Sequence, residues 1–196
     1  MFLIRHGETE FNVLGRLQGR FDSPLTPRGV AQAEAIGRHL RTLIGGAENW
    51  VIKSSPLGRT VTTAEIIRKQ TGISSAVIMD DRLREVSMGS WDGLSREEIG
   101  KRWPGAMGPS LRQSWVRACP DGETLDAVMA RLSDWLRSDA ERPNHIVVSH
   151  GISGGLVRGI YAHLPQEEML RLPTPQNSFY QLYSGAIQHI CCPDFE

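Results

Sequence analysis

Apolar residues follow two patterns that alternate along the chain from one end to the other. Short, nearly continuous apolar runs predict buried strands, and they lie at residues 2–4, 50–52, 76–79 and 145–149. Between them, apolar residues recur at three- and four-residue spacing, which predicts helices over residues 27–44, 56–67, 125–136 and 151–160. Strands that alternate with helices are typical of a parallel sheet with helices on its faces, so the pattern predicts an α/β fold.

Two of these helices are preceded by recognisable start signals. Thr26 is followed by Pro27, and a threonine N-cap with proline at the first helical position is a common helix start. Ser55 and Pro56 repeat this arrangement, so the next helix is expected to begin at Pro56. The glycine pair at residues 45–46 is expected to end the first helix.

The middle of the chain, residues 89–122, follows no sustained period. It contains many of the glycines and prolines, and one short helix is expected near residues 95–101. Trp91, Trp103 and Trp115 fall in this region. They are interpreted either as a lid over a site or as plain core.

The last part of the chain predicts a pair of strands. Apolar runs at residues 179–183 and 187–190 are separated by Ser184-Gly185, a turn signal. No repeat, linker or low-complexity segment interrupts the sequence. Residues 1–196 are therefore predicted to form a single domain, which at this length buries roughly 70% of its unfolded surface.

Composition excludes several classes of protein. The 22 basic and 22 acidic residues give a formal net charge of zero, so the chain has no general attraction to nucleic acid or to an anionic membrane. The 3 cysteines show no CxxC spacing, which argues against a disulfide framework or a zinc site. No leader or membrane-spanning run is recognisable, so we expect a cytoplasmic protein. Its oligomeric state is left open, with a homodimer as one alternative.

Candidate chemistry follows three of the predicted strands. Arg5-His6 follows the first, Ser54-Ser55 leads to Arg59 after the second, and His150-Gly151 follows the strand at 145–149. Because the carboxyl ends of parallel strands share one edge, these groups are expected to meet in one crevice. A cation in the first turn of a helix, such as Arg59, also predicts an anion bound beside it. Taken singly, each group has an ordinary alternative: a polar strand end, a solvated arginine or a hydrogen-bonded core histidine.

Taken together, the polar motifs resemble the histidine phosphatase superfamily in its phosphoglycerate-mutase-like branch. The matching segments occur in the family's order and span nearly the whole chain: residues 3–9 with Asn12, 15–19, 22–26, 54–59 with Thr63-Ala64, 83–85 with Gly89, Trp91 and Gly93, and 148–151. The resemblance implies a three-layer sandwich in which helices flank a mostly parallel central sheet.

The resemblance also implies a role for each matched residue. His6 matches the nucleophile that becomes a phosphohistidine, and Glu85 matches the general acid. Arg5, Arg59 and a protonated His150 are expected to hold the phosphoryl oxygens. Substrate contacts are expected from Asn12, Gln18, Gly19 and Gly151. We expect neither a metal nor another cofactor, since the cations take the place of Mg²⁺. For Glu85 alone, the ordinary alternative is a surface salt bridge with Arg82 or Arg84.

Among the reactions of this family, the sequence favours a phosphatase that acts on a small phosphorylated metabolite. The segment between Glu85 and His150 is compact, and its basic residues are scattered: Lys101, Arg102, Arg112 and Arg117. Residues 89–93 resemble the phosphatase type, and residues 15–26 and 120–124 resemble broad-specificity and α-ribazole phosphatases. The alternatives are a cofactor-dependent phosphoglycerate mutase and an inactive relative that binds phosphorylated ligands.

Overall fold

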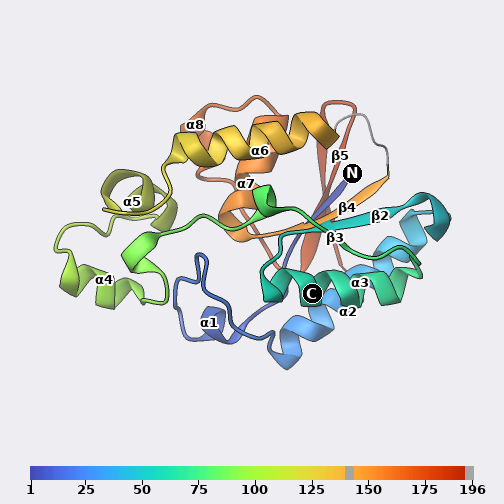
Figure 1. The fold of residues 1–196 in the computed structure, drawn as a ribbon, viewed down its shortest axis with the longest axis horizontal. Helices are drawn as coiled ribbons and strands as arrows, with labels where there is room; N and C mark the ends of the chain where they lie inside the picture. The colour runs from blue at the N-terminus through green and yellow to red at the C-terminus, as the bar shows by residue number, and fades with distance from the viewer. Residues whose placement is uncertain (140–143, 193–196) are drawn as a thin grey trace.

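The computed structural model describes residues 1–139 and 144–192, and within them it contains one six-stranded sheet (Figure 1). The strand order is β3-β2-β4-β1-β5-β6. The strands are β1 (Phe2–Arg5), β2 (Val51–Ser54), β3 (Ile78–Met79), β4 (His145–Ser149), β5 (Ser178–Tyr183) and β6 (Ala186–Cys191).

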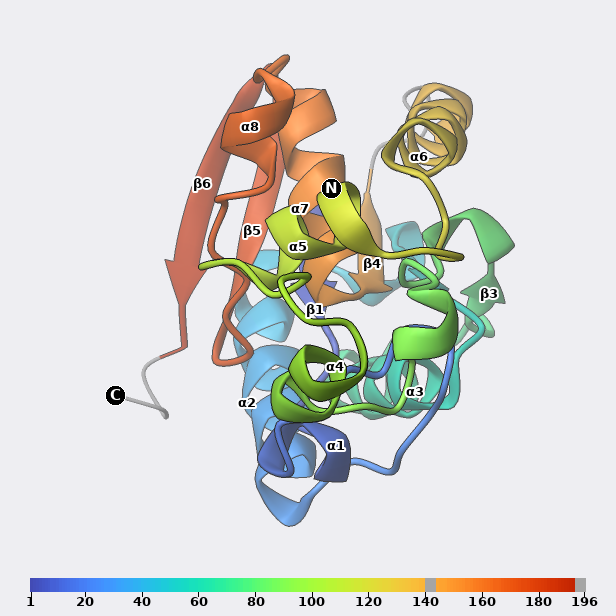
Figure 2. The same ribbon diagram turned by 90° about the vertical axis from the view of Figure 1, so that its left-hand side faces the viewer.

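The first four strands of that order run parallel to one another. β4 lies between β1 and β2, with Val147 opposite Leu3 on one side and Lys53 on the other. β5 is antiparallel to β1, and β6 pairs antiparallel with β5 at the sheet edge (Figure 2). The carboxyl ends of β1, β2 and β4 therefore lie side by side at one edge of the sheet, as the sequence predicts.

Helices cover both faces of the sheet (Figure 1). α2 (Pro27–Leu43) and α3 (Gly58–Thr71) lie on one face, and α6 (Leu125–Asp139) and α7 (Gly151–Tyr161) lie on the other. Alternate side chains of β1 enter the two layers, because Phe2 and Ile4 pack in the first and Leu3 packs in the second. Full burial of one such side chain contributes about 1.5–3 kcal/mol, so both layers are held firmly on the sheet. The predicted α/β sandwich is confirmed.

The start of α3 differs from the sequence expectation. The helix begins at Gly58 with Leu57 as its N-cap, not at Pro56. Ser55 does not cap the helix because its hydroxyl group lies 2.8 Å from His150 Nε2 and accepts a hydrogen bond from the Leu57 N–H. By contrast, Thr26 caps α2 and accepts from the Gly29 N–H, as expected. The predicted third strand at 76–79 is shorter and consists of Ile78–Met79.

The middle region contains more helix than its sequence pattern indicates. α4 (Arg96–Arg102) forms where a helix is expected and is capped by Ser95 and Glu98, whereas α5 (Leu111–Ala118) was not predicted. α1 (Glu10–Val13) and α8 (Gln166–Met169) were also missed, and short 3-10 turns complete the fold: η1 (Ala47–Asn49), η2 (Asp81–Leu83) and η3 (Gly89–Trp91). α4 and α5 lie at one end of the molecule, on the left in Figure 1.

The three tryptophans of this region belong to the core. Trp91 and Trp115 are 0% and 2% exposed, and Trp103 packs beside Trp91 with ring centroids 6.2 Å apart. The lid interpretation of these residues is therefore wrong. In the described part of the chain, Cys119, Cys191 and Cys192 are free thiols, and no helix is long and apolar enough to cross a bilayer.

Candidate active site

The three polar strand ends meet at the carboxyl edge of the sheet. His6 follows β1, Ser55 follows β2, and His150 follows β4 as the N-cap of α7. The rings of His6 and His150 have centroids 5.3 Å apart, and His150 Nε2 lies 2.8 Å from Ser55 Oγ. The predicted crevice is therefore present, and it brings together residues up to 144 positions apart in the sequence.

The ring of His6 is held by a hydrogen bond at one of its two nitrogens. Its Nδ1 lies 2.8 Å from the carbonyl oxygen of Gly7, and because a carbonyl only accepts, Nδ1 carries the hydrogen and Nε2 carries the lone pair. Burial, followed by the charges of Arg5 and Arg59, lowers the pKa of His6 well below its usual value. The ring is therefore neutral at physiological pH. Gly7 is required next to it, since a Cβ there would lie 2.3 Å from the Gly29 carbonyl oxygen.

Arg5 is a partly buried cation beside this ring. Its Nη1 donates to the Thr174 carbonyl oxygen at 2.7 Å, while its Nε is buried without a partner among the described residues. Burial lowers the pKa of Arg5 to about 10, opposed by the charge of Glu85, so the group stays protonated at neutral pH. The guanidinium group lies against the first residue of α7, since a Cβ built on Gly151 would be in ordinary van der Waals contact with the Arg5 Cζ at 3.5 Å. The unpartnered Nε is a donor that an oxyanion can use.

Arg59 lies in the first turn of α3 and is 2% exposed. Its guanidinium group donates to the carbonyl oxygens of Phe21 and Gly19 at 2.6 and 2.9 Å. The Asp22 carboxylate accepts from the Arg59 backbone N–H at 3.2 Å and from Nη1 at 3.1 Å. Asp22 thus supplies part of the negative charge that the sequence predicts at the start of α3. The buried Arg59 Nε has no partner among the described residues.

The protonation of His150 is set by its surroundings. Burial, followed by the charges of Arg59, His6 and Arg5, lowers the pKa of His150 well below its usual value. In the protein alone, burial and the charges of Arg59, His6, Arg5 and Arg131 favour a neutral His150, whereas the protonated form is expected beside a bound phosphoryl group. Its Nδ1 is buried with no partner among the described residues. A phosphate dianion beside the ring reverses this balance and favours the imidazolium.

Glu85 lies on the N-terminus of α7. Its Oε2 accepts from the Ile152 N–H at 3.0 Å, and its Oε1 accepts from both the N–H and the hydroxyl of Ser153 at 3.0 and 3.1 Å. The salt-bridge alternative is excluded, because Arg82 pairs with Asp80 and Asp134 and Arg84 pairs with Asp81. The residue as a whole is 9% exposed, and it lines the same pocket as His6.

The pocket at these strand ends has a volume of about 270 Å³. It contains every predicted site residue except His150, which lies behind His6 and borders a small adjoining cavity with Arg5. The predicted residues that line it are Arg5, His6, Asn12, Gln18, Gly19, Arg59, Glu85 and Gly151. In the described residues, no three His, Cys, Asp or Glu side chains are grouped so as to hold a metal ion. The chemistry of this wall, rich in guanidinium groups, suits an anion.

Asn12 and Gln18 have different hydrogen-bonding freedom in this pocket. Asn12 Oδ1 accepts from the Thr9 N–H and from Gln176 Nε2, so its amide N–H groups remain available to a ligand. Both ends of Gln18 are engaged, since Nε2 donates to Thr9 Oγ1 and Oε1 accepts from Ser23 Oγ. Asn12 is therefore the better candidate for holding an oxyanion, and Gln18 shapes the wall.

Arg112 lines the pocket, although the sequence pattern places it among the scattered basic residues between Glu85 and His150 and not at the site. It projects from α5, and its Nη2 donates to the Gly151 carbonyl oxygen at 3.2 Å and to Thr174 Oγ1 at 2.7 Å. Thr174 thus contacts both Arg5 and Arg112. Gln176 was also missed, and its Nε2 donates to the His6 carbonyl oxygen at 3.1 Å. No signal in the sequence identifies either residue, because α5 and the 172–176 segment reach the site only through the tertiary fold.

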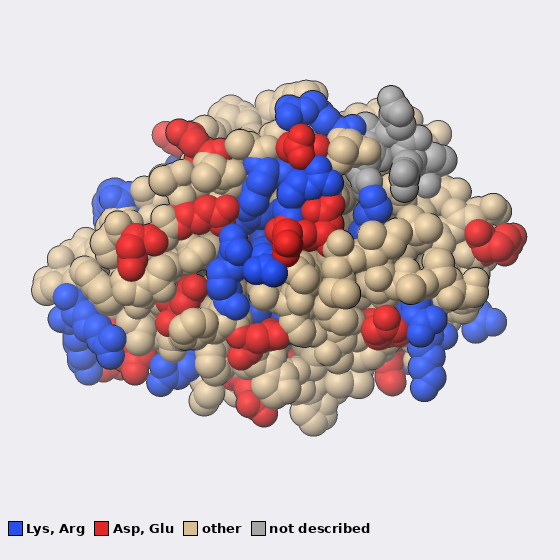
Figure 3. Space-filling model, viewed as in Figure 1, with Lys and Arg blue, Asp and Glu red and all other residues tan. Residues whose placement is uncertain are grey.

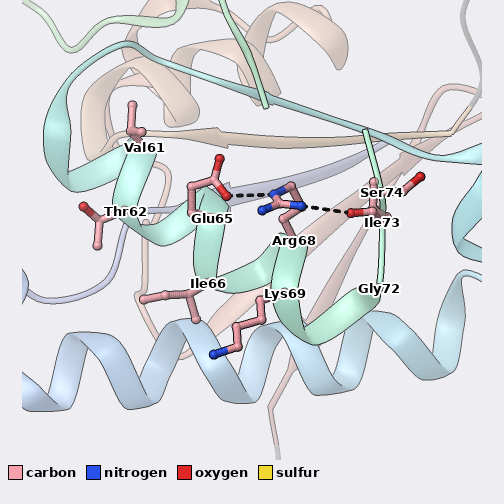
Figure 4. A pocket seen from close by; sticks show the side chains of 9 residues that line it. All are labelled: Val61, Thr62, Glu65, Ile66, Arg68, Lys69, Gly72, Ile73 and Ser74. Carbon is pink, nitrogen blue, oxygen red and sulfur yellow. Dashed lines mark hydrogen bonds and ion pairs between the residues drawn. The ribbon is translucent and has the colours of Figure 1, made fainter. Parts of the chain in front are cut away.

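A larger cavity of about 720 Å³ lies elsewhere, along α3 (Figure 4). The residues that line it come from Val61 to Ser74, and none of them belongs to a strand end. Its charged side chains include Glu65 and Arg68, which neutralise each other across 2.7 Å. This cavity has neither a nucleophile nor an unpaired cluster of charge, so the smaller pocket is the candidate active site.

With this geometry established, the family is clear. The chain belongs to the histidine phosphatase superfamily (branch 1), whose family model matches residues 1–186. The family predicted from the sequence is confirmed.

Individual relatives carry different activity names. The protein named "Probable phosphoglycerate mutase GpmB" of Klebsiella pneumoniae subsp. pneumoniae is 40% identical over 187 residues, covering 88% of this chain and 80% of that protein. The solved structure of Bacillus stearothermophilus YhfR is 28% identical, with a TM-score of 0.79 over 97% of this chain and 94% of that one. The mycobacterial glucosyl-3-phosphoglycerate phosphatase Rv2419c, in its complex with VO3, is 27% identical with a TM-score of 0.74 and covers 96% of each chain.

Proposed function

We propose that this chain is a metal-independent phosphomonoesterase that acts through a phosphohistidine on His6. The observation that carries the proposal is a neutral, buried imidazole beside the buried Arg59 and the partly buried Arg5, in a pocket that also contains the Glu85 carboxyl group. The neutral ring supplies a lone pair at pH 7, and the cations supply the charge that attracts a phosphate monoester.

In the first step, His6 Nε2 attacks phosphorus and the bond from phosphorus to the ester oxygen breaks. Glu85 gives its proton to the departing oxygen, so the products are an alcohol and phosphohistidine. In the second step, Glu85 takes a proton from water, the water oxygen bonds to phosphorus, and the bond between phosphorus and Nε2 breaks. Phosphate leaves, and His6 and Glu85 return to their starting states.

Arg5 and Arg59 are positioned to hold the phosphoryl oxygens in both steps. Each has a buried Nε without a partner among the described residues, and both line the pocket that contains His6. The Asn12 amide and His150 add further donors once an anion raises the pKa of His150. Phosphoryl transfer needs mainly positioning and charge neutralisation, which these groups provide without a metal ion.

A mutase is the second candidate, and two observations favour it. The GpmB proteins that match at 37–40% identity carry a mutase name, and Arg112 places one more guanidinium group in the pocket. A phosphatase is supported by the likeness to the mycobacterial glucosyl-3-phosphoglycerate phosphatase. The pocket wall also supports it, because in the described chain its lysine and arginine side chains are limited to Arg5, Arg16, Arg59 and Arg112. Arg16 is paired with Glu98 at 3.1 Å, which leaves little surplus charge for a bisphosphate.

The substrate class follows from the size and charge of the pocket. A volume of about 270 Å³ admits a small phosphorylated metabolite, which we propose as the substrate. The net charge of zero offers no attraction to nucleic acid or to a membrane surface. A cytoplasmic location, where such metabolites are made, is part of this proposal.

Three measurements test the proposed activity. In EDTA, the wild-type protein is expected to hydrolyse p-nitrophenyl phosphate, whereas His6→Ala is expected to be inactive. Rapid acid-free quenching with radiolabelled substrate is expected to trap an acid-labile phosphate on the wild type alone. With bisphosphoglycerate present, phosphate release is expected to exceed the conversion of 3-phosphoglycerate to 2-phosphoglycerate. Faster isomerisation than hydrolysis supports the mutase, and phosphate binding without turnover supports an inactive relative.

A further inference from the structure

A buried charge network with Glu123 at its centre lies beside the segment that contains Glu85. The Glu123 carboxylate accepts from Arg131 Nε at 2.7 Å and from Arg131 Nη2 at 3.1 Å, which is a two-point contact. It also accepts from Arg20 Nη2 at 3.2 Å. The side chains of Glu123, Arg131 and Arg20 are 16%, 15% and 33% exposed. Two arginines are thus held in fixed positions by one carboxylate.

Both arginines also bind the main chain around Glu85. Arg20 Nε donates to the carbonyl oxygen of Glu85 itself at 2.9 Å. Arg131 Nη1 donates to the carbonyl oxygen of Arg82, three residues earlier. Glu123 completes the contact on the other side, because its backbone N–H donates to the Ser87 carbonyl oxygen at 2.8 Å. The segment at 82–87 is therefore held at three points by one network.

The side chain of Glu85 is oriented from a different direction. Among the described residues, its oxygens accept hydrogen bonds from Val86, Ile152 and Ser153, and the last two belong to α7. The network thus fixes the main chain from which Glu85 projects, and α7 fixes its carboxylate. Figure 3 shows basic and acidic side chains side by side near the middle of this face. In the same view of Figure 1, α6 passes close to this part of the molecule.

Glu123 remains ionised under working conditions. Burial acts to raise its pKa, but the hydrogen bonds and charges of Arg131 and Arg20 outweigh burial and lower the pKa below its usual value. None of Glu123, Arg20 and Arg131 lines the pocket of His6, so these residues do not touch the substrate. Their hydrogen bonds reach the proposed general acid through its main chain, at the Glu85 carbonyl oxygen.

We propose that Glu123 is a positioning residue for the general acid: through Arg20 and Arg131 it holds the main chain of Glu85 so that the carboxyl group reaches the leaving oxygen. The inference rests on the proposed function, in which Glu85 protonates that oxygen. A general acid acts only within hydrogen-bond reach, and a displacement of about 1 Å can cost about 100-fold in rate. The acidic residue of the 120–124 motif thereby gains a role that its sequence alone does not reveal.

The test compares two leaving groups that need the acid to different degrees. Dinitrophenolate departs readily without a proton, whereas a simple alkoxide departs only with one. In Glu123→Gln, kcat/KM for an alkyl phosphate is expected to fall by about tenfold or more, while kcat/KM for 2,4-dinitrophenyl phosphate falls by less than about threefold. Glu65→Gln, which removes an exposed ion pair on α3, serves as the matched control and is expected to change neither value.

Two further variants separate positioning from a general loss of structure. Arg20→Met removes the donor to the Glu85 carbonyl but leaves the Arg131–Glu123 pair, and it is expected to show the same leaving-group dependence even where Glu123→Gln folds poorly. In a Glu85→Gln background, Glu123→Gln is expected to cause no further loss on the alkyl ester, because no acid remains to be positioned.

The possible failures are distinguishable. An equal loss on both esters in Glu123→Gln and Arg20→Met, or an additive loss in the Glu85→Gln background, overturns the positioning role. If Glu85→Gln alone shows no preference between the two esters, Glu85 is not the general acid, and the proposed function itself is overturned. If Glu85→Gln shows the preference and the other two variants do not, only the present inference fails.

Discussion

The imidazole rings of His6 and His150 pack edge to face, with centroids 5.3 Å apart and an interplanar angle of 64°. Both side chains are buried, and burial together with Arg5 and Arg59 lowers both pKa values well below the usual range. A proton on either ring is unfavourable unless an anion lies beside it. Phosphate and a proton are therefore expected to bind together, which couples substrate binding to the charge of His150.

This pair predicts a pH dependence of stability. Both histidines have a lower pKa in the folded state than in the unfolded state. Below the unfolded pKa, the unfolded chain therefore binds protons that the folded chain does not, and acid favours unfolding. The contribution of each histidine is complete above the unfolded pKa of about 6.5 and decreases by up to about 1.4 kcal/mol per pH unit below it. We expect the free energy of unfolding in urea to fall measurably between about pH 7 and pH 5.

The control for this experiment is His150→Gln, which keeps a side chain able to bond Ser55 but cannot titrate. Its unfolding free energy is expected to change less with pH over the same interval than that of the wild type. Added inorganic phosphate is expected to flatten the wild-type dependence, because an anion favours the protonated ring. Parallel pH profiles for the wild type and His150→Gln are inconsistent with a neutral buried His150.

A second prediction concerns the separation of binding and chemistry at Glu85. Glu85→Gln is expected to reduce hydrolysis of phenyl phosphate by about 100-fold or more, since an amide cannot donate the required proton. Inhibition by inorganic phosphate is expected to persist or strengthen, because the variant removes a negative charge from the pocket. Steady-state rates and inhibition constants measure both effects.

Glu8→Gln is a suitable companion variant for that measurement. Glu8 follows the same Arg5-His6-Gly7 triplet, but its carboxylate accepts from Thr26 Oγ1 and pairs with the exposed Arg28. Its turnover is expected to stay close to that of the wild type. Near wild-type turnover in Glu85→Gln contradicts the role assigned to Glu85.

Much of the fold and site could be predicted because local signals agree with the tertiary structure. Thr26 and Pro27 mark the start of α2, and Ser95 with Glu98 forms the capping box of α4. The convergence of His6 and His150 follows from the parallel order of β1 and β4, since both residues come directly after a strand. Prediction succeeds where one short segment determines both the element and the position of its polar residue.

The errors occur where distant contacts decide the structure. Ser55-Pro56 has the pattern of a helix start, but the Ser55 hydroxyl bonds His150, 95 residues away, and α3 begins at Gly58. Arg112 enters the pocket only because Thr174 and Gly151 accept its hydrogen bonds. The protonation of His150 depends first on its burial and then on the cations around it, and a sequence specifies neither.

Arg112 supplies a third prediction. Arg112→Met is expected to weaken inhibition by inorganic phosphate about tenfold, because it removes a positive charge beside Arg5 and loosens Thr174, whose carbonyl oxygen holds Arg5. Arg117→Met provides the matched control: it lies on the same helix α5 but is exposed and does not line the pocket. Equal inhibition constants for the wild type and Arg112→Met contradict a contribution of Arg112 to anion binding.

The last prediction concerns the glycine of the Arg5-His6-Gly7 triplet. In Gly7→Ala, the new Cβ would lie 2.3 Å from the Gly29 carbonyl oxygen, which belongs to the rigid first turn of α2. The backbone has to shift, so we expect a loss of about 1–3 kcal/mol in the free energy of unfolding, together with displacement of His6. Gly100→Ala is the matched control, since its Cβ meets nothing within 4 Å and lies inside helix α4. That variant is expected to gain up to about 1 kcal/mol, because alanine favours the helix. Urea unfolding of both variants measures these opposite signs, and a Gly7→Ala protein as stable as the wild type contradicts the close approach of the segment after β1 to α2.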